Sequence, residues 1–221
     1  MKHIVLVAPS RSGHNWTAQM LRSWLPGDKV YQLEGIPPKI YHNRIRTELW
    51  QGGQPKKDQP VIAVLQLRDF LNYAASLIKH LINTNNTSGR SVAAMLDIWL
   101  DVAREAFNDT SYIGEKYRLY YDHFVRSHAY RQGICCILDG KFSEENIDAV
   151  PTGGPGSSFD NFAYQGSGQR MKVLKRWKWF LTDEGNRYIS YLENRRNIVE
   201  YYTEHFDLSP GQKELAGYIL K

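Results

Sequence analysis

The segment Ile4–Leu25 constrains the fold of this chain more than any other. It begins with five apolar residues, Ile4–Ala8, which are typical of a strand buried on both faces. Turn-forming residues follow at 9–13, and apolar residues then recur with the spacing of one helix face. These are Trp16, Met20, Leu21 and Trp24. A strand, a turn and a helix in this order aim backbone N–H groups and the positive end of a helix dipole at one point, which predicts an anion site.

The residues of this turn supply the groups that an anion requires. Arg11 adds a fixed positive charge, and Ser10 and Ser12 add hydroxyl donors. A Walker P-loop would need a Lys-Ser or Lys-Thr pair after its last glycine. Gly13 is followed by a His-Asn pair, so an ordinary ATPase or kinase loop is disfavoured. From these residues alone, a plain strand–helix turn without a ligand is the alternative.

A second strand–helix unit follows a polar loop at 51–60. Val61–Leu67 is another continuous apolar strand, and apolar residues at helical spacing follow it from Phe70 to Ile82. Arg68 ends the strand, and Ser76 lies about two turns into the expected helix. The planar guanidinium of arginine forms bidentate, charge-assisted hydrogen bonds with phosphate. An ion pair between Arg68 and a surface carboxylate is the alternative.

The first turn resembles the 5′-phosphosulfate loop of sulfotransferases that use PAPS (3′-phosphoadenosine-5′-phosphosulfate), typically P-K-S-G-T-T-W. Pro9, Ser12, Gly13 and Trp16 match this pattern, with one extra residue after the proline. Arg11 stands where most cytosolic members carry lysine. The two threonines of the pattern are replaced, and the replacements are His14 and Asn15.

The second unit resembles the segment R-N-P-x-D-x-x-x-S, with which sulfotransferases bind the 3′-phosphate of PAPS. Arg68 and Ser76 have its spacing, whereas Asp69 and Phe70 replace the Asn-Pro pair. The resemblance implies a third contact from a basic segment near the C-terminus. Arg170 is the first candidate and Arg176 the second.

The resemblance implies PAPS as co-substrate, PAP (the desulfated nucleotide) as product and no metal. The implied cofactor-binding residues are Pro9, Ser10, Arg11, Ser12, Gly13, His14, Asn15, Trp16, Arg68, Ser76 and Arg170. The implied catalytic residues are Arg11 and His42. His42 lies where many members carry a catalytic Thr-His pair, although Tyr41 replaces the threonine. Glu34 and His14 are competing candidates for the base.

Alternating strands and helices predict an α/β fold, a single domain over 1–221 whose central parallel β-sheet is flanked by helices. The resemblance implies the P-loop-containing, nucleotide-hydrolase-like sulfotransferase fold. The expected strands are 4–8, 29–33, 39–42, 61–67 and 118–122. Besides the helix of the first unit, the expected helices are 70–82, 91–107, 130–138 and a long one from Thr182 toward Phe206.

Composition leaves three classes of function open. A net charge of +5 suits an anionic ligand or nucleic acid. A kinase or NTPase would use Asp69 or Asp139 for magnesium, and a nucleic-acid-binding module would use the basic, aromatic segment 172–179. The sulfotransferase hypothesis explains both anion turns and leads us to expect a small-molecule, glycan or peptide acceptor and no nucleic acid.

The cysteines and the hydropathy pattern bear on the compartment. The two cysteines, Cys135 and Cys136, are neighbours and cannot form a disulfide framework. We therefore expect a reducing, cytoplasmic compartment. We expect no signal peptide, and no apolar run is long enough to span a membrane.

Overall fold

The computed structural model describes residues 1–41, 60–86, 89–145, 147–148, 159 and 172–221. Its centre is a parallel sheet of four strands in the order β2-β1-β3-β4. The strands are β1 (His3–Ala8), β2 (Lys29–Glu34), β3 (Val61–Leu67) and β4 (Lys116–Tyr120). Every neighbouring pair is parallel. The prediction of an α/β fold with a central parallel sheet flanked by helices is confirmed.

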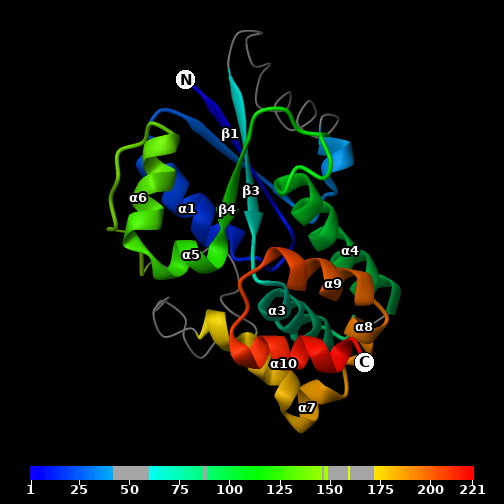
Figure 1. Ribbon diagram of the computed structural model, residues 1–221. Helices are drawn as coiled ribbons and strands as arrows, with labels where there is room; N and C mark the ends of the chain where they lie inside the picture. The colour runs from blue at the N-terminus through cyan, green and yellow to red at the C-terminus, as the bar shows by residue number, and fades with distance from the viewer. Residues whose placement is uncertain (42–59, 87–88, 146, 149–158, 160–171) are drawn as a thin grey trace.

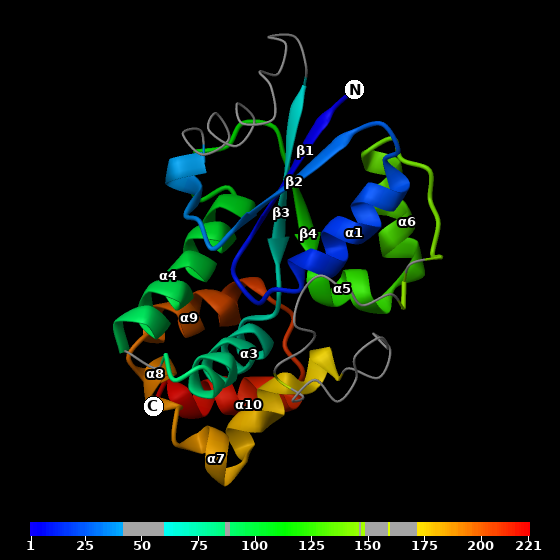
Figure 2. The same cartoon turned by 180° about the vertical axis from the view of Figure 1, so that it is seen from behind.

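Helices surround this sheet on three sides (Figure 1). One face is covered by α1 (His14–Trp24), α5 (Tyr121–Arg126) and α6 (His128–Ile137), and the other by α4 (Gly89–Ala106), as the reverse view also shows (Figure 2). Beyond the carboxyl ends of the strands lies a second group of helical segments. These are α3 (Phe70–Asn83), η4 (Val173–Leu181), α7 (Asp183–Asn186), α8 (Ser190–Glu193), α9 (Arg196–His205) and α10 (Pro210–Ile219).

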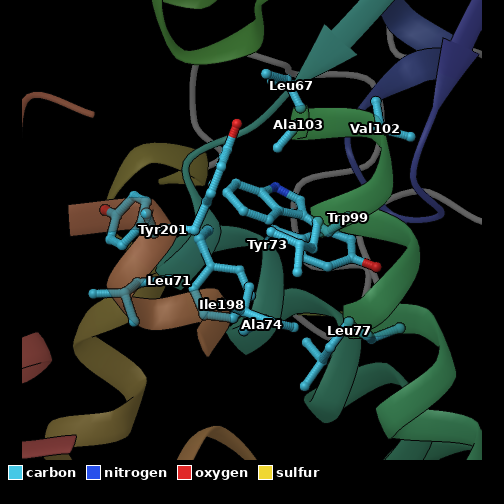
Figure 3. Packing of buried hydrophobic residues seen from close by; sticks show 14 of the residues in the cluster. Leu67, Leu71, Tyr73, Ala74, Leu77, Trp99, Val102, Ala103, Ile198 and Tyr201 are labelled. Atoms are coloured by element: carbon cyan, nitrogen blue, oxygen red, sulfur yellow. The ribbon is translucent and has the colours of Figure 1, made fainter. Parts of the chain in front are cut away.

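The alternation of side chains along the strands divides the interior into two hydrophobic cores. Val5 and Val7 of β1 face the core built with α3, α4, α9 and α10. Ile4 and Leu6 face the core built with α1, α5 and α6. Trp99 lies near the middle of the first core, among residues of three helices (Figure 3). The burial of both faces explains why β1 and β3 consist almost entirely of apolar residues.

The prediction of a strand at 39–42 is wrong for the residues that the structure describes, 39–41. Pro38–Ile40 form a short 3₁₀-helix, η1, with Pro37 as its N-cap. Two successive prolines supply no N–H group to a sheet ladder, whereas proline fits the first turn of a helix. His42 lies outside the described residues.

The prediction of one long helix from Thr182 is also wrong, because this segment forms three separate helices, α7, α8 and α9. Its predicted start is confirmed: the Thr182 hydroxyl accepts from the Gly185 amide at 3.2 Å. A Cβ atom on Gly185 would lie 2.0 Å from the Trp179 carbonyl oxygen. α7 therefore packs closely against η4 at Gly185, a contact that the apolar periodicity of the sequence does not reveal.

The other predicted elements are shifted by a few residues at their ends. The strand expected at 118–122 is β4, and it ends at Tyr120 because α5 begins at Tyr121. Within the described residues, no helix combines the length and the apolar character that crossing a membrane requires.

Candidate anion-binding site

The turn between β1 and α1 has a fixed, unusual backbone. Arg11 and Gly13 both have positive φ angles, 66° and 88°. The Ser12 amide donates to the Pro9 carbonyl at 3.2 Å. A Cβ atom on Gly13 would lie 2.3 Å from the Tyr121 ring. Glycine is therefore required at position 13 both by the backbone conformation and by the close approach of this ring.

A buried glutamine connects this turn to the neighbouring strand. Gln66 of β3 donates from Nε2 to the Ser12 carbonyl at 2.7 Å and lies 3.3 Å from the Ser12 hydroxyl. Both side chains are completely buried. Our sequence analysis missed Gln66, although a single amide within the apolar strand Val61–Leu67 is a detectable signal. The contact fixes the turn relative to the end of β3.

Arg68 brings a buried positive charge to the turn. Its side chain is 1% exposed, and its Nη atoms donate to the carbonyls of Arg11 at 3.1 Å and Val173 at 2.6 Å. Its guanidinium carbon lies 5.4 Å from the centre of the Tyr121 ring. Nε has no hydrogen-bond partner among the residues that the structure describes. Among the described residues, the groups that accept hydrogen bonds from this guanidinium are neutral carbonyls.

Ser76 of α3 is paired with a second buried arginine. Its hydroxyl accepts from Arg176 Nη1 of η4 at 2.8 Å. The Arg176 guanidinium also lies 4.8 Å from the centre of the Phe159 ring, which Lys79 approaches to 4.7 Å. Of the two basic residues expected from the C-terminal segment, Arg176 therefore lies at Ser76, while Arg170 is outside the described residues.

Glu34 and His14 form a pair next to Arg11. His14 Nε2 lies 3.1 Å from Glu34 Oε2, and the His14 side chain is buried while the Glu34 side chain is 45% exposed. The hydrogen bond with His14 is the main cause that lowers the pKa of Glu34; burial opposes it, and Ser10 and Arg11 add to the lowering. Burial lowers the pKa of Arg11, Glu34 opposes this, and Arg68 adds to it.

Asp69 follows Arg68 and caps α3. Its carboxylate accepts from the Asn72 amide at 2.8 Å, from Gln212 Nε2 at 2.6 Å and from the Tyr202 hydroxyl. Asp122 accepts from the Asp69 amide at 2.7 Å. Burial, with the nearby charge of Asp122, raises the pKa of Asp69 to about 6. This carboxylate joins α3 to α9 and α10.

The described residues give little support to a magnesium site. The Asp69 carboxylate is used in capping and in contacts between helices. Asp139 pairs with Lys2, which precedes β1 and so lies at the opposite end of the sheet from the turn. The part of the chain that the structure describes contains no group of three or more His, Cys, Asp or Glu side chains that could hold a metal ion.

The structure brings most of the predicted site residues to one place. Segment 9–16, Arg68 and Ser76 all follow the carboxyl ends of β1 and β3, where parallel sheets bind ligands. Within the segment, Asn15 is exposed, and the Trp16 indole packs edge-on against Tyr121 and Phe124. The contact of Tyr121 with the turn was not predicted from the sequence.

Comparison with known proteins found a structural similarity and no sequence match. No family model and no curated protein matches the chain. The structure is similar to the crystal structure of mouse sulfotransferase SULT7A1 complexed with PAP, with 13% sequence identity and a TM-score of 0.49. The match covers 98% of this chain and 89% of the mouse protein chain.

Proposed function

We propose that the protein is a PAPS-dependent sulfotransferase, which moves the sulfuryl group of PAPS to a hydroxyl or amine of an acceptor. The observation that carries this proposal is Arg68, a buried cation whose described hydrogen bonds go to the Arg11 and Val173 carbonyls. None of the described carboxylates accepts a hydrogen bond from this guanidinium. A buried charge without an ionic partner is costly, and a bound phosphate would offset that cost. A small-molecule, glycan or peptide acceptor fits the proposal.

In this proposal the turn at 9–16 binds the 5′-phosphosulfate. The backbone N–H groups at the start of α1 and the hydroxyls of Ser10 and Ser12 donate to its oxygens. Arg11 stabilises the negative charge that develops on the bridging oxygen as the sulfur–oxygen bond breaks. Since that charge is larger in the transition state than in bound PAPS, Arg11 contributes more to turnover than to PAPS affinity.

In this proposal a second group of residues binds the 3′-phosphate. Arg68 and Ser76 are its proposed ligands, and Arg176 joins them because it already donates to Ser76. A guanidinium is suited to this task because its planar fork matches two phosphate oxygens. Arg170 remains a candidate ligand from the sequence pattern.

A base takes the proton of the acceptor. His42 is the candidate that the sequence resemblance implies, and it lies outside the described residues. Among the described residues, Glu34 has the better geometry, because its carboxylate is partly exposed and is held beside Arg11 by His14. A carboxylate is ionised near neutral pH and can accept a proton there.

Thermal unfolding with nucleotides tests the proposal. We expect PAP to raise the melting temperature and ATP to raise it much less, because ATP lacks the 3′-phosphate. A ligand at 100 times its dissociation constant adds about 2.7 kcal/mol. For a chain of this size, this corresponds to roughly 5–11 °C. Equal shifts with PAP and ATP, or no shift with PAP, would contradict a PAPS site.

A further inference from the structure

His14 and Glu34 belong to different elements that meet at the turn. His14 is the first residue of α1, and Glu34 is the last residue of β2. The strand register pairs Glu34 with Ala8, the last residue before the turn, and the Gly35 amide donates to the Ala8 carbonyl at 2.9 Å. The pair therefore spans the turn from one side to the other, and its geometry depends on the backbone of β1 and β2.

The two side chains of this pair differ in exposure. The His14 side chain is 7% exposed, whereas the Glu34 side chain is 45% exposed. A glutamate that reaches solvent normally samples several rotamers, and ordering it costs free energy. A buried imidazole whose Nε2 lies 3.1 Å from Oε2 restricts those rotamers in advance.

Resting on the proposed sulfotransferase function, we propose that His14 is a positioning residue that fixes the Glu34 carboxylate as the base facing the acceptor. Nε2–H donates to Oε2, and the Ser10 side chain also hydrogen-bonds the carboxylate. A lone pair that these contacts leave free accepts the proton of the acceptor. The sulfotransferase loop pattern has threonine at this position, and its shorter side chain lacks a ring nitrogen to reach this far.

Packing alone does not explain a histidine at this position. His14 Nδ1 is buried and has no hydrogen-bond partner among the described residues. A buried polar atom without a partner destabilises the fold, so a smaller or apolar residue would pack at lower cost. The contact that the imidazole does make, with Glu34, is the contact to which we assign its role.

Substitutions of His14 test this role through the release of PAP from PAPS with water as the acceptor. In this reaction the sulfur–oxygen bond to the 5′-phosphate breaks, a bond from sulfur to the water oxygen forms, and the products are PAP, sulfate and the two protons of the water. His14→Ala should lower kcat by about 10- to 100-fold, the effect of one hydrogen bond to a charged group. KM for PAPS should change by less than about threefold. His14→Gln places an amide donor near Nε2 and should restore most of kcat.

A double-mutant cycle separates positioning from general damage. In a Glu34→Gln background, His14→Ala should change kcat by less than about twofold, because its effect acts through the carboxylate. His128→Ala is the matched control. His128 is the first residue of α6, and its Nδ1 lies 3.1 Å from Glu144 Oε2, the same distance as in the His14–Glu34 pair. This substitution should leave kcat unchanged. Additive losses at positions 14 and 34 would overturn the proposal.

Two further measurements distinguish failure of this role from failure of the proposed function. Calorimetric binding of PAP by the wild type tests the nucleotide site alone, and absence of binding would refute the function. Titration of the Glu34 carboxyl by ¹³C NMR needs no substrate. We expect the pKa of Glu34 to rise in His14→Ala and to fall again in His14→Gln. An unchanged Glu34 pKa in His14→Ala would overturn the role of His14.

Discussion

Arg68 is almost completely buried, yet its described hydrogen bonds go to neutral carbonyls. Arg131 offers a contrast within the same chain. It is also buried, at 5% exposure, but its guanidinium pairs with the Glu144 carboxylate. Removing a partner from a buried ion pair is strongly destabilising. No carboxylate accepts a hydrogen bond from Arg68 within the part of the chain that the structure describes, so in the proposed function a bound anion is the stabilising change.

We expect Arg68→Ala to weaken PAP binding far more than the binding of adenosine 5′-phosphosulfate, which lacks the 3′-phosphate. One charge-assisted hydrogen bond contributes about 1.5–3 kcal/mol, or roughly 10- to 150-fold in the dissociation constant. Calorimetry with the two nucleotides measures the ratio. Arg131→Ala is the control, and it should leave the ratio unchanged. Equal losses for both nucleotides in Arg68→Ala would show that Arg68 does not contact the 3′-phosphate.

Sequence reasoning reached the site residues that lie close together along the chain. Arg68 and Ser76 follow one strand, so their spacing predicts that they lie near each other. The approach of Arg176 to Ser76 could not be predicted in this way, because η4 folds back onto α3 from a distant part of the chain. The contact between Tyr121 and Gly13 has the same origin. Tertiary packing, which spacing does not encode, determines both contacts.

Among the elements, the strands buried on both faces were the most predictable. β1 and β3 are short apolar runs bounded by turns, a pattern that leaves few alternatives. The segment after Thr182 was less predictable. Its apolar spacing fits one helix, yet the segment is divided into α7, α8 and α9, and Arg195 before α9 has a non-helical backbone. Apolar spacing indicates which residues face the core and does not indicate where the backbone leaves the helix.

The Asp69 carboxylate connects three helices, α3, α9 and α10, and should make their association depend on pH. Its pKa in the folded protein is about 6, above its ordinary value of 3.8, so folding favours its protonated form. This contribution to stability is complete below about pH 3.8 and is lost as the pH rises through 6. We expect Asp69→Asn to gain up to about 3 kcal/mol in unfolding free energy relative to wild type between pH 4 and 7. Urea unfolding at a series of pH values measures this difference.

Asparagine suits this comparison because it is as good an N-cap as aspartate and keeps an oxygen for the Asn72 amide. Asp97→Asn is the control, because Asp97 lies on the exposed side of α4, where it pairs with Arg195. A stability difference between Asp69→Asn and wild type that does not change with pH would contradict the assignment.

At the scale of the whole molecule, two buried tryptophans provide a matched test of the two cores. Trp99 donates from Nε1 to the Arg68 carbonyl at 2.9 Å, and Trp24 donates to the Ser143 carbonyl at 2.7 Å. Both side chains are fully buried, and Figure 3 shows Trp99 in its core. Each Trp→Phe substitution removes one hydrogen bond and some volume, so we expect a loss of about 1–3 kcal/mol in either variant.

Only Trp99→Phe should also reduce PAP affinity, by several-fold, because Trp99 holds the backbone of Arg68. Thermal unfolding measures the stability of each variant, and calorimetry measures its PAP affinity. If Trp24→Phe weakens PAP as much as Trp99→Phe does, the effect reflects general loss of packing rather than the position of Arg68.

Both neighbours of β1 are made later than β1 itself. β2 begins at Lys29 and β3 begins at Val61, so β1 cannot be enclosed on both edges until more than a quarter of the chain has been synthesised. At about 5–20 residues per second, this delay lasts roughly 3–10 seconds. An unpaired apolar strand is a site of aggregation during that interval. We therefore expect ribosome-bound fragments that end before β3 to bind chaperones, and longer fragments that include the sheet and its helices to escape them.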